Sequence, residues 1–83
     1  MKLAVEMSLY PLSDDYIPDI QGFIDRLNQY SAITVVTNAM STQVCGDYDD
    51  VMAMLTTELK PEMEQQRKVV LVCKFLNSDI FAE

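Results

Sequence analysis

The sequence predicts an α+β fold, in which a single antiparallel sheet carries two helices on one of its faces. Three observations lead to this prediction. Apolar residues alternate with polar ones near the amino terminus, later stretches are rich in β-branched residues, and two segments repeat apolar residues every three or four positions. The chain has 83 residues and is expected to form one domain, residues 1–83, whose small core supplies only marginal stability by itself.

The first strand is expected over residues 2–9 and is followed by a helix over residues 16–30. Every second residue of the strand is apolar, which is typical of a strand with one buried face. Pro11 is expected to end the strand, because proline cannot donate a hydrogen bond to the ladder. Residues 13–15 are of capping types, and the helix after them repeats apolar side chains along one face. Gly22 should weaken that helix by ~1 kcal/mol relative to alanine.

Residues 33–37 and 42–46 are expected to form the second and third strands, joined as a hairpin. The second strand is rich in β-branched residues, and Asn38-Ala39-Met40-Ser41 must reverse the chain after it. Residues 69–76 are almost entirely apolar and are expected to form the last strand. Residues 77–83 are expected to form a tail.

The second helix is expected to begin at Asp47. Aspartate is a favoured N-cap residue, and Asp50 three positions later complements the positive end of a helix. Pro61 should kink this helix or split off a second short segment, because it removes an amide donor and clashes with the preceding turn. Arg67 and Lys68 suit the negative end.

This order of elements predicts the ferredoxin-like βαββαβ sandwich, with sheet order 4-1-3-2 and both helices on one face. The other face is then bare. On it we expect Glu6, Ser8 and Tyr10 of the first strand, together with one alternating set of the last strand. That set is either Val70, Val72 and Lys74 or Val69, Leu71 and Cys73. Because such a face is unfavourable in water, we expect a second subunit to cover it and form a homo-oligomer.

The chain is acidic. Six basic and thirteen acidic residues give a net charge of −7, with an isoelectric point near 4.2. This charge repels phosphate backbones and anionic membranes, so nucleic acid and membranes are not expected partners, whereas a cationic small molecule suits it. No apolar stretch reaches the ~20 residues of a membrane span, and residues 1–6 are unlike a signal peptide. We therefore expect a cytoplasmic protein with reduced cysteines.

Few residues could support catalysis or metal binding. The sequence has no histidine, so Ser8 and Ser41 lack a triad partner of the usual kind. Cys45 and Cys73 fall on strands roughly 9 to 10 Å apart, too far for a disulfide, and two cysteines do not make a zinc site. The acidic clusters are explained by helix capping. We expect no metal, no cofactor and no enzymatic activity; an enzyme that uses Glu6 as a base is a less favoured alternative.

Glu6 is the one charged residue within the first strand after Lys2. On a central strand it cannot reach solvent over a sheet edge, so it needs a partner, either Lys74 on the neighbouring strand or a ligand. Ser8 and Tyr10 are expected beside it on the same face, and the hairpin is expected to bring Thr42 across the sheet. A carboxylate, hydroxyls and an aromatic ring together favour a flat, polar heterocycle as ligand.

Two short motifs resemble those of a known family. The segment Ser8-Leu9-Tyr10-Pro11 and the later Ser41-Thr42, followed after three residues by Gly46-Asp47, are similar to elements of the YkoF family. Members of that family bind thiamine and its hydroxymethylpyrimidine moiety. The resemblance covers essentially the whole chain and also implies the ferredoxin-like fold. YkoF itself resembles two such domains in one chain, so here a second half would come from another subunit.

The resemblance implies a ligand site that includes Ser8, Tyr10, Ser41 and Thr42. It also implies that Gly46 and Asp47 have a structural role as turn and cap. We add Met40, Asn38 and Glu6 to the candidate ligand-binding residues; Glu6 matches no motif of the family. An oligomeric interaction or regulatory module without a small-molecule ligand is the alternative function.

Overall fold

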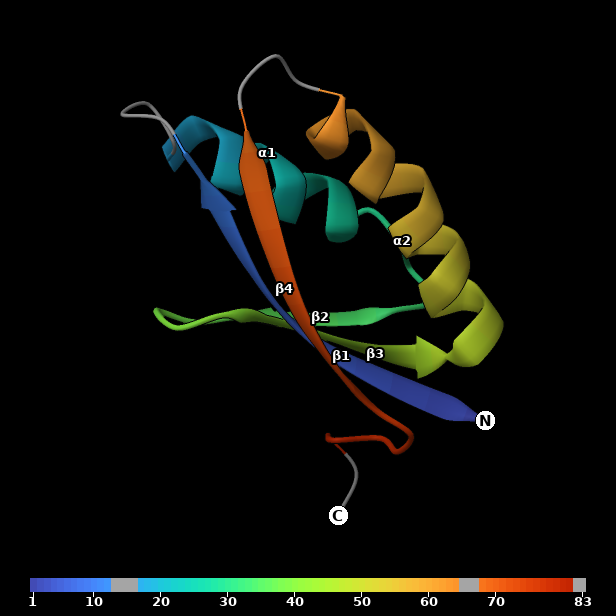
Figure 1. Ribbon diagram of the computed structural model, residues 1–83. Helices are drawn as coiled ribbons and strands as arrows, with labels where there is room; N and C mark the ends of the chain where they lie inside the picture. Colours follow the sequence, from blue (N-terminus) through green and yellow to red (C-terminus); the bar gives the residue numbers. More distant parts are fainter. Residues whose placement is uncertain (13–16, 65–67, 82–83) are drawn as a thin grey trace.

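The computed structural model describes residues 1–12, 17–64 and 68–81, and it contains the six expected elements in the expected order (Figure 1). They are β1 (Lys2–Pro11), α1 (Ile17–Leu27), β2 (Thr34–Thr37), β3 (Thr42–Asp47), α2 (Tyr48–Met63) and β4 (Val69–Leu76). The four strands form one antiparallel sheet in the order β2-β3-β1-β4, which is the predicted order read from the other edge. The predicted fold class is confirmed. The capping predicted for residues 13–15 and the part predicted for Arg67 lie outside the described residues.

Strand β1 is longer than predicted, because it continues through Pro11, which is paired with Val69. The amide of Leu12 donates to the carbonyl of Lys68 at 2.9 Å. In an antiparallel ladder the hydrogen bonds alternate, so the even-numbered residues of β1 bond to β4 and the odd-numbered ones face the other side. The nitrogen of Pro11 therefore points away from β4, to a side where no residue of β3 is paired with β1, and the proline removes no ladder bond.

Both helices lie on one face of the sheet, and the core is the layer between the helices and the sheet (Figure 1). The apolar residues of β1 that alternate in the sequence point into this layer, where they meet the apolar stripes of the helices. The buried core residues are Leu3, Val5, Met7, Phe23, Leu27, Ile33, Val44, Val51, Met54 and Leu55. This packing fixes α1 beneath the end of β1 that carries the candidate residues.

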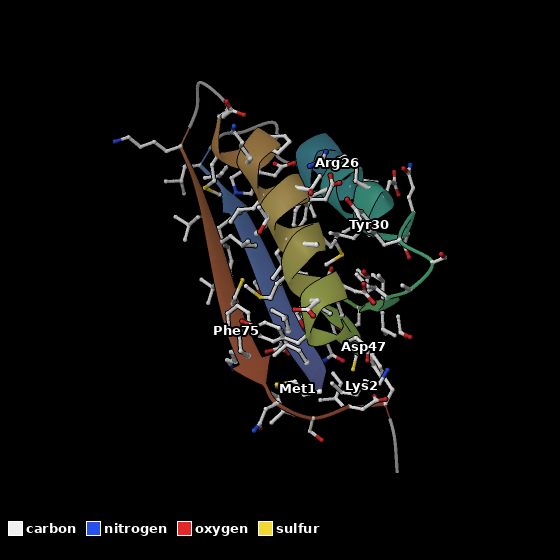
Figure 2. All side chains as sticks on the ribbon, turned by 90° about the vertical axis from the view of Figure 1, so that its right-hand side faces the viewer. Met1, Lys2, Arg26, Tyr30, Asp47 and Phe75 are labelled. Atoms are coloured by element: carbon white, nitrogen blue, oxygen red, sulfur yellow. The ribbon has the colours of Figure 1, made fainter. Side chains whose placement is uncertain are left out.

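Helix α2 differs from prediction at both ends. It runs unbroken through Pro61 to Met63, so the predicted splitting is wrong. Pro61 lies in the last turn, where only a few residues follow it, and the amide of Glu64 still donates to Lys60 at 2.9 Å. Asp47 occupies the N-cap position, but its side chain makes no capping hydrogen bond. It instead forms a salt bridge with Lys2 at 3.2 Å (Figure 2).

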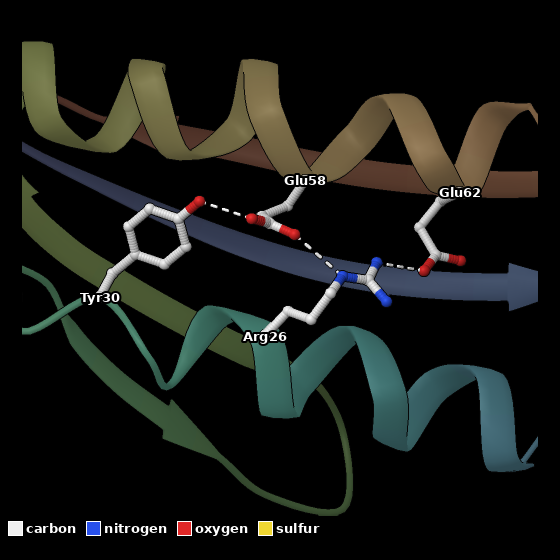
Figure 3. Close-up of polar contacts among 4 residues, drawn as sticks. All are labelled: Arg26, Tyr30, Glu58 and Glu62. Carbon is white, nitrogen blue, oxygen red and sulfur yellow. Dashed lines mark hydrogen bonds and ion pairs between the residues drawn. The ribbon is translucent and has the colours of Figure 1, made fainter.

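A polar cluster joins the two helices (Figure 3). The Arg26 guanidinium donates from Nε to Glu58, at 2.9 Å, and from Nη2 to Glu62, whose side chain is buried. The Tyr30 hydroxyl donates to the other oxygen of Glu58. The hydrogen bond to Glu62 raises the pKa of Arg26 above its ordinary value. Because removing one partner of a buried pair leaves a charge uncompensated, this cluster holds α1 and α2 in one arrangement.

The sheet face without helices, called the open face below, is covered at one end only. The thiol of Cys45 lies 3.4 Å from the Asp79 carboxylate, and Phe81 lines a small cavity beside it, so the segment after β4 folds back over this end. Towards the other end, large apolar side chains remain exposed. They are Tyr10, Val36, Val70 and Val72. Leu76, opposite Ala4 and therefore near the covered end, is also exposed on this face. Of the two sets considered for the last strand, the open face therefore carries Val70, Val72 and Lys74.

Both cysteines are free, as the sequence predicts. Cys45 lies on the open face, whereas Cys73 is paired with Met7 and points to the helix side. Burial raises the pKa of both thiols. Among the described residues, no helix is long and apolar enough to cross a membrane.

Candidate functional site

The sheet contains an opening beside the first residue of β3, Thr42. β3 is paired with β1 only as far as Thr42 opposite Met7, whereas β1 continues to Pro11 beside β4. The hairpin turn, residues 38–41, lies across from this free stretch of β1. A cavity of about 200 Å³ occupies the opening, with α1 on its helix side.

The cavity brings together six of the seven candidate residues predicted from the sequence. They are Ser8, Tyr10, Asn38, Met40, Ser41 and Thr42. The remaining wall residues are Met7, Leu9, Ile20, Phe23, Ile24, Thr37 and Ala39. Glu6 does not line the cavity, but it is hydrogen-bonded to Ser41 at its rim. Residues from β1 and from the hairpin therefore meet at one place although they are far apart in the sequence.

The main chain of β1 is also part of this site. The alternation of the ladder directs the N–H and C=O of Leu9 to the side on which Met7 bonds to β3. At Leu9, however, β3 has turned away into the hairpin. A free strand edge of this kind offers one donor and one acceptor to any group that enters the opening.

Asn38 holds the hairpin turn in shape. Its backbone N–H donates to the backbone carbonyl of Ser41 at 3.0 Å. Its side-chain oxygen accepts from the backbone N–H of Met40 at 2.8 Å and from that of Ser41 at 3.1 Å. Asparagine suits this role because its short side chain reproduces a backbone turn. The Met40 side chain is left 85% exposed at the edge of the cavity, an unusual position for a large apolar group.

Thr42 does not share the face of Glu6, which corrects the expected arrangement. It is paired with Met7 and is buried on the helix side, where its hydroxyl lies 3.1 Å from that of Thr37. It still lines the cavity, together with Ser8 and Tyr10, whose positions in β1 belong to the other face. Ser8 and Tyr10 approach the same cavity from the open face.

Glu6 has two partners at once. Its Oε2 accepts a hydrogen bond from the Ser41 hydroxyl at 3.1 Å, and its Oε1 lies 3.6 Å from the ammonium nitrogen of Lys74. The predicted pairing with Lys74 is thus present together with a link to the cavity rim. Because the Lys74 side chain is 80% exposed, this ion pair is worth little and can open readily.

The sequence did not identify the α1 side of the cavity. Ile20, Phe23 and Ile24 belong to the apolar stripe of α1, which the sequence indicates only as core-facing. Nothing in their spacing separates residues that pack on the sheet from residues that line an opening in it. That distinction depends on where β3 begins.

Other features of the described residues give no competing candidate. A larger cavity, of about 370 Å³, lies between α2 and residues 29–33 but contains none of the predicted residues. Within residues 1–12, 17–64 and 68–81, no group of three or more cysteine, aspartate or glutamate side chains is placed to hold a metal ion.

Solved structures with the same fold come from several bacteria. A Thermotoga maritima protein described as a "putative thiamine biosynthesis/salvage protein" is 18% identical, with a TM-score of 0.74 over 90% of this chain and 82% of that one. A Streptococcus pneumoniae protein is 24% identical, with a TM-score of 0.82 over 96% and 90%. A Bacillus cereus domain of unknown function is 15% identical, with a TM-score of 0.74 over 94% and 77%. At these identities the likeness is one of fold.

Comparison with protein families is more specific. No curated protein matches the chain. The model of the YkoF-related family, however, matches residues 2–78, which include both motifs and every residue of the cavity. The chain belongs to the YkoF-related family.

Proposed function

We propose that this protein binds thiamine or its hydroxymethylpyrimidine moiety in the cavity beside the start of β3. The observation that carries the proposal is the meeting of Ser8, Ser41, Thr42 and Asn38 in one opening beside the apolar residues of α1. A few convergent polar groups against an apolar wall are typical of small-molecule sites. Membership of the YkoF-related family and the fold shared with the Thermotoga maritima protein described as a "putative thiamine biosynthesis/salvage protein" support a thiamine-related role.

The size and charge of the site suit the pyrimidine ring of the ligand inside the cavity and the thiazolium ring outside it. A volume of about 200 Å³ is below the roughly 300–1,000 Å³ of sites that enclose drug-sized ligands, so it suits a single ring. The pyrimidine ring would enter the cavity, where Met40 and Tyr10 can pack on its face. The cationic thiazolium would remain outside, near Glu6, in the field of a chain with net charge −7.

The proposed role is binding without catalysis, in the cytoplasm, for uptake or salvage of the vitamin. The polar groups of the cavity are hydroxyls, an amide and main-chain groups, which orient a ligand but do not move protons at neutral pH. Glu6, the carboxylate of the site, is already engaged by Ser41 and Lys74.

The open face supports a second copy of the chain as partner. Tyr10 is 54% exposed, and Val70 and Val72 are 45% and 48% exposed on the same face. An exposed apolar surface of this kind is typical of an interface. Tyr10 belongs to both the open face and the cavity, so a second subunit would come close to the ligand.

Ligand binding can be tested by calorimetry with thiamine and, separately, with hydroxymethylpyrimidine, alongside thermal unfolding. Binding to the native state must raise the melting temperature. At a free ligand concentration of a hundred times the dissociation constant, it adds about 2.7 kcal/mol to the free energy of unfolding. Thr42→Val should weaken binding, because it removes a cavity hydroxyl while keeping the shape of the side chain. Thr34→Val, on an exposed position of β2 outside the cavity, is the matched control.

The outcomes separate the alternatives. Saturable binding that Thr42→Val weakens and Thr34→Val leaves unchanged supports the proposal. No heat and no thermal shift with either compound, in a protein that light scattering finds to be oligomeric, would favour an interaction module without a ligand. Unchanged affinity in Thr42→Val would remove that residue from the site.

A further inference from the structure

The hydroxyl of Ser41 has a fixed polarity. It lies 3.1 Å from Oε2 of Glu6, whose other oxygen is paired with the Lys74 ammonium. An ionised carboxylate can only accept hydrogen bonds. The Ser41 hydrogen is therefore committed to Glu6. Toward the cavity, which it lines, Ser41 can offer only the lone pairs of its oxygen.

Asn38 has the opposite polarity. Its Oδ1 accepts two backbone N–H groups, those of Met40 and Ser41. Only the oxygen of an amide can accept, so these two bonds also establish which terminal atom is which. Both acceptor sites of the oxygen are used within the turn. What Asn38 can offer to the cavity, which it also lines, is the pair of hydrogens on Nδ2.

An acceptor, Ser41, and a donor, Asn38, are thus held on the same four-residue turn. Ser41 remains an acceptor toward the cavity while Glu6 is ionised, and Asn38 remains a donor while its oxygen accepts the two backbone N–H groups. We propose that this pair selects a heterocycle whose edge carries an amino group beside an unprotonated ring nitrogen. The amino group donates to Ser41, and the ring nitrogen accepts from Asn38. This inference rests on the proposed function and makes Glu6 the positioning residue that sets the selectivity of the site.

The same geometry rejects the corresponding oxo heterocycle. There the amino group is replaced by a carbonyl, and the adjacent ring nitrogen carries a hydrogen. Lone pairs would then face lone pairs at Ser41, and N–H would face N–H at Asn38. Turning the ring over would restore the hydrogen bonds but would carry the substituent next to the amino position away from the mouth of the cavity. Sites that hydrogen-bond a ligand group discriminate strongly against analogues that leave their own groups unpaired.

The test compares thiamine with oxythiamine, the analogue that has an oxo group in place of the amino group, by calorimetric titration. Both carry the same thiazolium charge, so the ratio of their affinities isolates the pyrimidine edge. Thiamine should bind at least about tenfold more tightly, the loss expected for one or two mismatched hydrogen bonds. Equal affinities would overturn the selectivity but leave the proposed function standing. No binding of either compound would overturn both.

A variant of Glu6 tests the cause of the selectivity. In Glu6→Gln the side-chain amide can donate to Ser41, which frees the Ser41 hydroxyl to donate toward the cavity. The affinity ratio of thiamine to oxythiamine should then fall toward one, even if both affinities drop because a negative charge is lost. Glu64→Gln, an equal change of charge on an exposed residue outside the cavity, should keep the wild-type ratio. A wild-type ratio in Glu6→Gln would remove Glu6 from the explanation.

Discussion

Side chains from both faces of the sheet contribute to one cavity. Ser8 and Tyr10 approach it from the open face, whereas Met7 and Thr42 approach it from the helix face. Neighbouring residues of a strand normally point to separate environments. Here they meet because the sheet itself has an opening beside the free end of β1. The site thus depends on individual side chains near a strand terminus.

Tyr30 should ionise at a higher pH than an ordinary tyrosine. Its hydroxyl donates to Glu58, and this hydrogen bond to a carboxylate raises the pKa of Tyr30 above the ordinary value of about 10. The hydrogen bond stabilises the folded protein at pH values below about 10, and this contribution is lost as the pH rises through the raised pKa. Ultraviolet titration should detect the ionisation of Tyr30 as a late phase, above this ordinary value.

The assignment can be checked with two variants. Tyr30→Phe should remove the late phase, and Glu58→Gln should move it to lower pH because the carboxylate is gone. A Tyr30→Phe variant that loses tyrosine ionisation only at or below the ordinary pKa would contradict the contact in Figure 3.

At the scale of elements, the two helices have different tasks. Helix α1 closes the cavity on one side through Ile20, Phe23 and Ile24. Helix α2 covers the core and holds α1 through the bonds of Glu58 and Glu62 to Arg26. The position of the cavity wall therefore depends on the contact between the helices.

Gly22→Ala should stabilise the protein by about 0.5–1 kcal/mol, because alanine is the better helix former and loses less entropy on folding. A Cβ at Gly22 would meet only the end of the flexible Arg26 side chain, at 3.9 Å. Gly46→Ala is the contrasting variant and should destabilise, since its Cβ would lie 3.2 Å from the backbone oxygen of Ala32. Urea unfolding measures both, and a Gly22→Ala variant less stable than wild type would contradict the open surroundings of that position.

At the scale of the whole molecule, the open face is the main surface without a partner in the described part of the chain. Its exposed valines and tyrosine surround the ion pair of Glu6 with Lys74. In the described part of the chain, no third layer covers this surface. Covering it from outside would bury it and would enclose the approach to the cavity from the Tyr10 side.

Val72→Lys should convert an oligomer into monomers of 9.4 kDa, measured by light scattering. Val72 is 48% exposed on the open face, so a lysine is tolerated in a single chain but unfavourable between two apolar faces. Met63→Lys makes the same change of charge at an apolar residue of α2 that is 45% exposed, and should leave the mass unchanged. A wild-type mass in both variants would place the interface elsewhere, and a monomeric wild-type protein would reject the proposed oligomer.

Local patterns were sufficient to predict the elements and their order. The alternation in residues 2–9, the β-branched run of residues 33–37 and the apolar periodicity of the helices each depend on residues close in sequence, so they can be identified without the rest of the chain. The Ser8 to Pro11 and Ser41 to Thr42 motifs likewise marked segments that the fold brings together at the cavity.

Tertiary structure decided three other features. Pro61 stays within α2 because the helix ends soon after it, and the face of Thr42 follows from its register with Met7. The cavity exists because β3 begins at Thr42, opposite Met7, whereas β1 continues past Met7 to Pro11. Each feature depends on how one strand is aligned with another or on where an element stops. The free energy that settles these points comes from contacts between residues distant in sequence, which no local pattern contains.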